Sequence, residues 1–168
     1  TISYDDLVYC SGGTGCTHTA NIHQSGIINI CSGQSALLSC DNNINYTYQW
    51  RMNGISISGA TADTFYATDP GVYSVMVSEN GCPMFSQAIT VNVTTGPAKP
   101  TIMASGNIAP CTNDTMTLST NSGATSYAWS TGATTQSIDI TTSGSYIVSV
   151  YDNYGCYAAS DPYSVNAS

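Results

Sequence analysis

Apolar and polar residues alternate with a period of two along much of the chain. The alternation is clearest in residues 35–40, 72–77, 116–120 and 146–150. Successive side chains of an extended strand point to opposite faces, so this period predicts β-strands with one buried face. Gly, Asn and Asp interrupt the runs about every 8–12 residues, as turns between antiparallel strands do. We therefore predict an all-β chain built from antiparallel sandwich strands, and we find no amphipathic helical pattern.

The same series of landmark residues occurs twice. Each copy has a cysteine, a Tyr-x-Trp triplet, a Gly-x-Tyr triplet and a Gly-Cys pair at similar spacings, which indicates an internal repeat of about 70 residues. The matched residues are Cys31 with Cys111, Trp50 with Trp129, Tyr73 with Tyr146, and Cys82 with Cys156. The residues expected in the cores are Trp50, Tyr73 and Val75 in the first copy and Trp129, Tyr146 and Val148 in the second.

The repeat divides the chain into two predicted domains, at 22–95 and 101–168. Residues 96–100 between them contain two prolines, which makes this linker stiffer than a Gly/Ser tether. Residues 1–21 do not match the repeat. We expect them to form an N-terminal extension, a short strand followed by a loop between cysteines.

Two features of each copy resemble the immunoglobulin fold. The tryptophan, and the tyrosine that ends D-P-G-V-Y (69–73) or T-S-G-S-Y (142–146), resemble its core tryptophan and tyrosine corner. The runs P-A-K-P-T-I (97–102) and Y-A-W-S-T-G-A-T-T-Q-S-I (127–138) resemble, more narrowly, the immunoglobulin-like repeats of very large secreted surface proteins of Bacteroidetes-type bacteria. The resemblance implies two tandem immunoglobulin-like antiparallel β-sandwiches in an extracellular, non-catalytic protein. Such repeats serve as stalks, adhesins, filaments or spacers attached to secreted enzymes.

Charged residues are scarce and mostly acidic. They make up 7% of the chain, ten acidic and two basic, for a net charge of −8. A surface of this sign does not attract nucleic acid or an anionic membrane. No apolar stretch approaches the roughly 18 residues that a spanning helix needs. We expect no nucleic-acid partner and no membrane insertion, and we expect a secreted bacterial protein, extracellular or at the cell surface, whose export signal has been removed.

Seven cysteines in a chain with so little Lys and Arg indicate an exported, disulfide-bonded protein. The matched positions make one bond within each copy the simplest connectivity, and the short loop of the extension suggests a local third bond. The predicted pairs are Cys31–Cys82, Cys111–Cys156 and Cys10–Cys16.

Cys40 has no obvious partner, because Val75 stands where an antibody-type domain carries the second cysteine of its inter-sheet bridge. We interpret Cys40 as a free buried thiol packed against Trp50. A bond from Cys40 to Cys10 or Cys16 is the alternative.

The N-terminal extension allows two further interpretations. Cys10, Cys16, His18 and His23 could form a zinc site, although their spacing is uncommon and an oxidising compartment favours disulfides. Alternatively, the strand around residues 7–9 could add to the sheet edge of a neighbouring copy.

The sequence predicts no enzyme. Neither histidine lies in a recognisable Ser/His/Asp arrangement, and hydrolase, zinc-protease and phosphate-binding motifs are missing. Glu79 falls in a predicted turn. Asp5-Asp6, residues 41–43 and Asn113-Asp114 offer oxygen ligands without a calcium-loop motif, so we expect no cofactor, with calcium as the alternative.

We therefore predict a structural or adhesive module, a subunit or repeat of a surface filament or long adhesin. Its expected partners are identical chains or neighbouring immunoglobulin-like repeats. Possible contact residues are Tyr4, Leu7, Val8 and Tyr9 in the extension and Tyr154 and Tyr157 near the last turn. The alternative is a glycan-binding or spacer module attached to a secreted enzyme, because some of the twelve tyrosines could stack on sugars.

Overall fold

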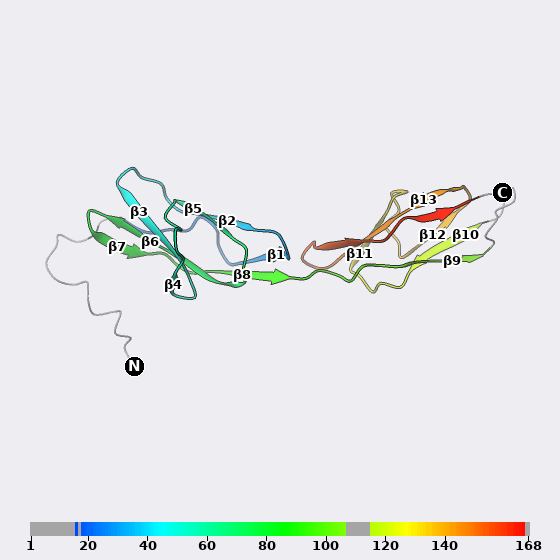
Figure 1. Cartoon of the computed structure of the whole chain (residues 1–168), viewed down its shortest axis with the longest axis horizontal. Helices are drawn as coiled ribbons and strands as arrows, with labels where there is room; N and C mark the ends of the chain where they lie inside the picture. Colours follow the sequence, from blue (N-terminus) through cyan, green and yellow to red (C-terminus); the bar gives the residue numbers. More distant parts are fainter. Residues whose placement is uncertain (1–15, 17, 107–114, 167–168) are drawn as a thin grey trace, which may run out of the picture. The chain divides into compact units, whose positions relative to one another are not determined.

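The computed structural model describes residues 16, 18–106 and 115–166, and all the regular secondary structure in them is β-strand (Figure 1). The predicted all-β class is confirmed. The chain divides into two compact units. The described residues through Ile28 and Ser35–Asn92 belong to the first, and Asn29–Gln34 and Val93–Ser168 to the second. The short segment Asn29–Gln34 therefore groups with the second repeat, although the sequence alone assigned it to the first domain.

Two sheets build the first unit. Its strands are β1 (Ile27–Cys31), β2 (Ala36–Ser39), β3 (Tyr46–Met52), β4 (Ile55–Ser56), β5 (Thr64–Ala67), β6 (Gly71–Glu79), β7 (Cys82–Phe85) and β8 (Ile89–Thr94). Of these, β1 and β8 end in residues that belong to the second unit. The larger sheet has the order β1-β8-β6-β3-β4, and β7 pairs with the C-terminal part of β6. The smaller sheet pairs β2 with β5, antiparallel.

The core of the first unit lies between these two sheets. The ring of Phe65 on β5 is 5.9 Å from that of Trp50 on β3 and 5.9 Å from that of Tyr73 on β6. Trp50, Tyr73, Val75 and Val77 are at most 1% exposed. Side chains of the smaller sheet thus pack directly on those of the larger one.

Three small sheets build the second unit. Its strands are β9 (Ile102–Gly106), β10 (Met116–Thr120), β11 (Ser126–Trp129), β12 (Ser137–Ile140), β13 (Gly144–Tyr146), β14 (Val148–Tyr151), β15 (Tyr157–Ala159) and β16 (Tyr163–Val165). The sheets are β12-β10-β9, β11-β14-β15 and β13-β16. Trp129, Tyr146 and Val148 lie in one buried cluster with residues of all three sheets.

Buried polar atoms of the matched aromatic residues find equivalent partners in both units. The indole Nε1 of Trp50 donates to the Ala62 carbonyl at 2.9 Å, and that of Trp129 donates to the Thr135 carbonyl at 2.8 Å. A buried N–H without such a partner would cost about 1–3 kcal/mol. In each unit, the loop that carries the acceptor carbonyl must therefore pass close to the indole N–H.

The matched tyrosines do the same at the start of the next strand. Tyr73 donates its hydroxyl to the Asp69 carbonyl at 2.8 Å, and Tyr146 donates to the Thr142 carbonyl at 2.8 Å. In both cases the acceptor lies four residues upstream, so the hydroxyl holds the corner that leads into the strand. Burial, with a smaller contribution from the Asp69 carboxylate, raises the pKa of Tyr73.

Strand register extends the correspondence. Leu38 pairs with Phe65 in the first unit as Leu118 pairs with Ile138 in the second. A serine after β7 and a serine after β15 make the same pair of bonds to the central strand. The Ser86 N–H donates to the Val75 carbonyl, and the Ser86 hydroxyl accepts the Val75 N–H. Ser160 makes the same two hydrogen bonds with the backbone of Val148.

One difference concerns the central strand. β6 runs without interruption, whereas its counterpart is divided into β13 and β14 by Ile147, whose N–H donates to the Ser130 hydroxyl. The hairpin after β6 turns at Asn80-Gly81, and both residues have positive φ, as a tight two-residue hairpin requires.

We expect Tyr73→Phe to lower the free energy of unfolding of the first unit by about 1 kcal/mol, because it removes the hydroxyl that satisfies the Asp69 carbonyl and leaves the ring in place. Urea titration followed by tryptophan fluorescence measures the change. Tyr66→Phe is the matched control, since Tyr66 is 62% exposed and its loss of a hydroxyl should leave the transition unmoved. Equal effects of the two variants would contradict the structural role of the Tyr73 hydroxyl.

Candidate functional sites

Both disulfides in the described part of the chain join segments that are distant in sequence. Cys16 bonds to Cys82 with 6.0 Å between Cα atoms, and Cys31 bonds to Cys156 with 5.6 Å. The predicted pairs Cys31–Cys82, Cys111–Cys156 and Cys10–Cys16 are therefore wrong, because at least one cysteine of each has another partner. Cys10 and Cys111 themselves lie outside the described residues. The two bonds indicate a protein of a non-reducing environment.

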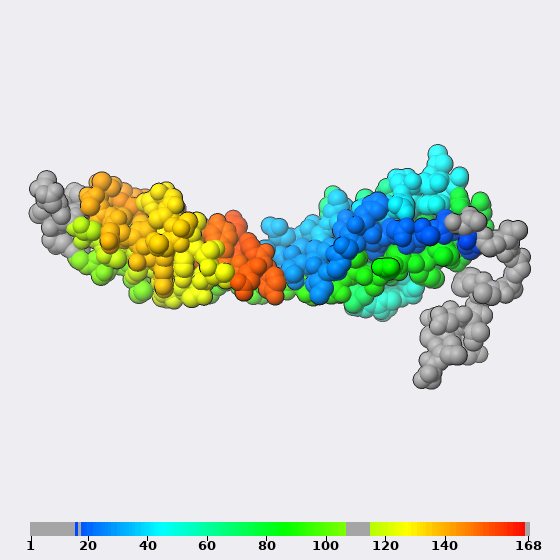
Figure 2. All heavy atoms as spheres, turned by 180° about the vertical axis from the view of Figure 1, so that it is seen from behind, coloured from blue at the N-terminus to red at the C-terminus, as the bar shows by residue number. Residues whose placement is uncertain are grey.

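The pairing of Cys16 with Cys82 follows from how the N-terminal segment lies on the first unit. His18 is buried, its Nε2 is 3.3 Å from the Val77 carbonyl oxygen on β6, and its ring is 5.3 Å from that of Tyr46. Figure 2 shows this segment in dark blue against residues of the first unit. Anchoring His18 beside the C-terminal end of β6 brings Cys16 to the hairpin that carries Cys82.

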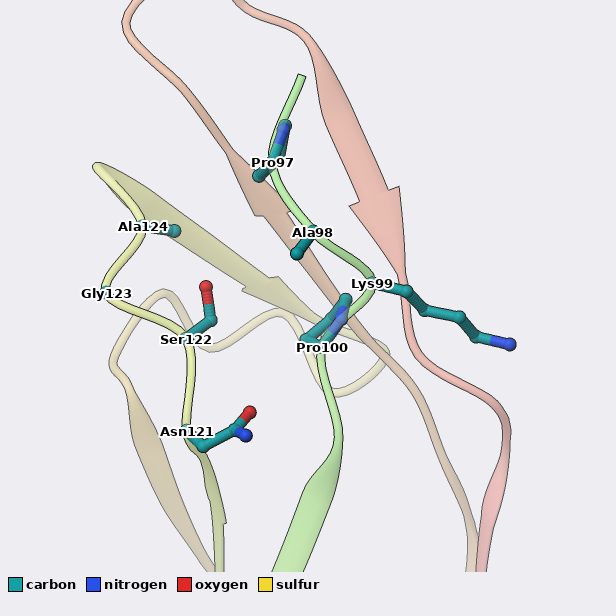
Figure 3. A pocket seen from close by; sticks show the side chains of 8 residues that line it. All are labelled: Pro97, Ala98, Lys99, Pro100, Asn121, Ser122, Gly123 and Ala124. Carbon is teal, nitrogen blue, oxygen red and sulfur yellow. The ribbon is translucent and has the colours of Figure 1, made fainter. Parts of the chain in front are cut away.

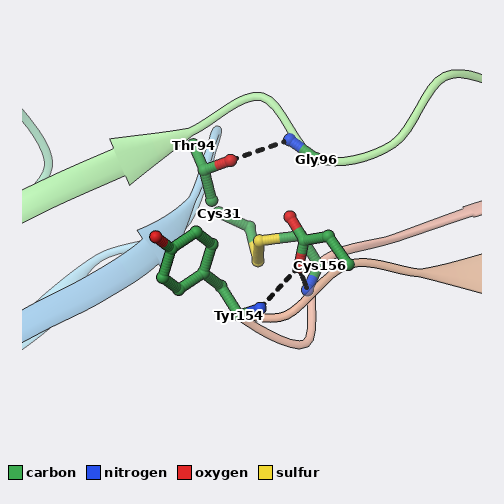
Figure 4. Close-up of a disulfide and its surroundings, with 6 residues drawn as sticks. Cys31, Thr94, Gly96, Tyr154 and Cys156 are labelled. Atoms are coloured by element: carbon green, nitrogen blue, oxygen red, sulfur yellow. Dashed lines mark hydrogen bonds between the residues drawn. A yellow bond between two sulfur atoms is a disulfide. The ribbon is translucent and has the colours of Figure 1, made fainter. Parts of the chain in front are cut away.

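The Cys31–Cys156 bond lies within the second unit, since Cys31 belongs to the segment Asn29–Gln34 (Figure 4). The turn before Cys156 is held by the Asp152 carboxylate, which accepts the N–H groups of Tyr154 at 2.8 Å and Cys156 at 2.9 Å. Gly96 has φ +73°, and a Cβ there would come within 3.1 Å of the Cys156 Cβ. Residue 96 must therefore stay small for the cysteine to fit.

Cys40 is buried in the first unit and its thiol is free. The alternative of a Cys40–Cys16 bond is wrong, because Cys16 is taken by Cys82. The Cys40 Sγ donates to the Asp63 carbonyl at 3.3 Å. Burial, with smaller contributions from the carboxylates of Asp63 and Asp41, raises the pKa of Cys40 to about 11. The thiol is therefore protonated at neutral pH and is a poor nucleophile.

We expect Cys40 to resist alkylation by iodoacetamide in the native protein at pH 8 and to react fully in denaturant, because the reactive thiolate is suppressed by burial. Peptide-level mass spectrometry reads the modification at this one residue. Rapid native modification of Cys40, at a rate near that of free cysteine, would contradict the buried, protonated thiol.

The structure brings Ser39, His23 and Asp41 together, an arrangement that the sequence did not reveal. His23 Nε2 lies 2.9 Å from Asp41 Oδ1, and His23 Nδ1 lies 3.2 Å from Ser39 Oγ. The hydrogen bond with His23 and a weaker one from Asn21 hold the pKa of Asp41 below its ordinary value. Both ring nitrogens of His23 are thus engaged, and the side chains of His23 and Asp41 are about half exposed, at 51% and 48%.

This cluster fastens the N-terminal segment to β2. Gln24 donates its amide to the Ser39 hydroxyl at 3.2 Å and accepts the Ser39 N–H at 3.0 Å. The Ser39 carbonyl accepts the His23 N–H at 2.9 Å. In the Ser-His-Asp triad of serine proteases the histidine Nε2 faces the serine and Nδ1 faces the carboxylate, the reverse of the arrangement here. The signal that sequence reading missed is the pairing of Ile22 with Cys40, which sets these residues side by side.

Metal-ligand candidates are dispersed. Within residues 16, 18–106 and 115–166, no three His, Cys, Asp or Glu side chains come together to hold an ion. The proposed zinc site would need Cys16, which is in a disulfide. Of the calcium candidates, Asn42 donates to the Asp63 carboxylate at 2.5 Å, and Asp5-Asp6 and Asn113-Asp114 lie outside the described residues.

Two of the six predicted contact residues are described and exposed. Tyr154 is 60% and Tyr157 is 66% exposed, and the Tyr157 ring lies 5.7 Å from that of its cross-strand neighbour Tyr151. The other four, Tyr4, Leu7, Val8 and Tyr9, lie outside the described residues.

A shallow hollow of the second unit lies between residues 97–100 and 121–124 (Figure 3). Its lining is mostly small. The side chain of Lys99 points away from it and donates to Asp161 at 2.6 Å, outside the hollow. Asn121 accepts the Thr101 N–H at 3.5 Å. The hollow therefore offers little charge or chemistry to a ligand.

No known protein family matches the chain, and no curated protein matches it. The described residues contain no helix long and apolar enough to cross a membrane.

Proposed function

We propose that the chain is a non-catalytic, load-bearing module of an extracellular filament or long adhesin, which associates with copies of itself. Two immunoglobulin-like sandwiches form its two units, of the kind found in large secreted surface proteins of Bacteroidetes-type bacteria. The proposal rests on the polar and cysteine side chains. In every cluster described above, they form hydrogen bonds or disulfides that hold segments of the chain together.

The immunoglobulin-like assignment is supported by the paired aromatic residues. A buried tryptophan on the third strand and a tyrosine whose hydroxyl returns to a carbonyl four residues upstream are marks of that fold, and both units have both. The disulfide that joins the two sheets of antibody domains has no counterpart in the first unit. Cys40 is free, and the position of the second cysteine is taken by Val75, which is buried in the core.

The observation that carries the load-bearing role is the covalent path through the chain. The Cys31–Cys156 bond closes 125 residues, and the Cys16–Cys82 bond overlaps it in sequence. Between Cys16 and Cys156, a pulling force can therefore straighten only residues 16–31 before covalent bonds take the load. Residues 32–155, which contain nearly all the strands, are shielded from extension.

The composition supports the same role. Only 7% of the residues are charged, so most polar side chains are neutral and few charges lose water when two molecules associate. Closure of each long loop contributes about 2–4 kcal/mol of stability to units whose cores are small.

Single-molecule stretching of the full chain between terminal tags tests the covalent path. With both disulfides intact we expect the distance between Cys16 and Cys156 to reach at most about 50 Å in the fully extended chain, at ~3.4 Å per residue. Reduction of the disulfides should raise this to about 480 Å, because all of residues 16–156 can then extend.

Two double variants sharpen the measurement. Cys31→Ser/Cys156→Ser should raise the fully extended distance to about 250 Å, because the load then runs through the Cys16–Cys82 bond and along residues 82–156. Cys16→Ser/Cys82→Ser is the matched control and should keep the limit of about 50 Å. Full-length extension of the oxidised wild-type chain would overturn the load-bearing proposal.

A further inference from the structure

The outward face of the larger sheet in the first unit carries one guanidinium among apolar side chains. Arg51 lies on β3, Val72 and Met76 on β6, and Phe85 on β7, all on the side opposite the buried Trp50, Tyr73 and Val75. Val72 is 44% exposed and Phe85 is 51% exposed, while Arg51 and Met76 are partly buried. We call these four residues the Arg51 face.

The second unit shows that the fold does not require this face. The shared tryptophan, tyrosine and serine contacts fix the correspondence between the strands of the two units. Arg51, Val72, Met76 and Phe85 correspond in this way to Ser130, Ser145, Ser149 and Ala159. The same positions thus carry small side chains on an equivalent scaffold, so the large ones need a reason other than folding.

Two contacts hold the Arg51 side chain in place. Its guanidinium carbon lies 5.2 Å from the centre of the Phe85 ring, a cation–π contact that holds the side chain over the sheet. One Nη2 N–H is donated to the Gly54 carbonyl, while Nε is shut off from solvent and has no partner in the structure. Ser74, opposite Arg51 on β6, is small enough for the side chain to pass over.

Arg51 also has no counter-ion among the described residues. The other basic residue, Lys99, is paired with Asp161, but no carboxylate of the described residues forms an ion pair with Arg51. The chain as a whole carries ten acidic residues against two basic ones. A guanidinium with free donors beside exposed apolar groups matches a surface that presents a carboxylate next to apolar side chains.

We propose that the Arg51 face binds a second copy of this chain, which places a carboxylate on Arg51 and apolar side chains on Phe85 and Val72. Arginine, methionine and aromatic residues are enriched at protein interfaces, and a copy of this chain offers ten acidic side chains as local partners for the guanidinium. The inference rests on the self-association part of the proposed function and names the surface that performs it.

Sedimentation velocity of the oxidised full chain over a range of concentrations tests this surface. We expect wild-type protein to dimerise reversibly. The variant Arg51→Ser/Val72→Ser/Met76→Ser/Phe85→Ala, which gives the first unit the residues of the second, should raise the dimer dissociation constant at least tenfold. Arg51→Ser alone should account for a large part of that change. Near-ultraviolet circular dichroism should match that of wild type, since every replacement occurs on the equivalent scaffold.

Leu37→Ser/Tyr66→Ser is the matched control. These two residues form an exposed cross-strand pair on the smaller sheet, 45% and 62% exposed, and their removal should leave dimerisation unchanged. Dimerisation that survives the fourfold variant, whatever the control does, overturns the Arg51 face and leaves self-association standing. A chain that stays monomeric at every concentration overturns both, while the covalent load path is judged separately by stretching.

Discussion

Burial of one tryptophan and one tyrosine in each unit is the constraint on which the rest of the structure depends. The rings fill the cores, but an indole N–H and a hydroxyl removed from water need acceptors. Each unit meets this need with main-chain carbonyls, so the loop that reaches Trp50 and the corner that reaches Tyr73 are fixed in shape. The second unit repeats both solutions with Trp129 and Tyr146, although the loop sequences differ.

Disulfide bonds, rather than networks of charged side chains, join distant segments of this chain. Among the described residues, Lys99–Asp161 is the one ion pair that does not involve a histidine, and it is exposed. Exposed pairs of that kind contribute little. The overlapping disulfides instead fasten segments from the first 31 residues to hairpins near residues 82 and 156. His18, buried on the first unit, holds the N-terminal segment beside the hairpin that carries Cys82.

Much of the fold could be predicted from the sequence, and little of the candidate sites. Period-two alternation and the paired Trp and Tyr residues indicated the strands and the buried side chains, because these depend on local geometry. The disulfide partners could not be predicted, since equivalence of Cys31 with Cys111 says nothing of which hairpin each one meets. The contact of His23 with Asp41 and the Arg51 face likewise depend on register between strands, which alternation alone leaves open.

The connectivity of the disulfides is the central claim, and cleavage at methionine in acid, without reduction, tests it most directly. The five methionines place Cys82, Cys111 and Cys156 on three different fragments, and acid suppresses thiol exchange. The structure predicts that fragment 1–52 stays covalently joined to both 77–84 and 117–168. Recovery of 117–168 joined to 104–116 and separate from 1–52 would contradict it.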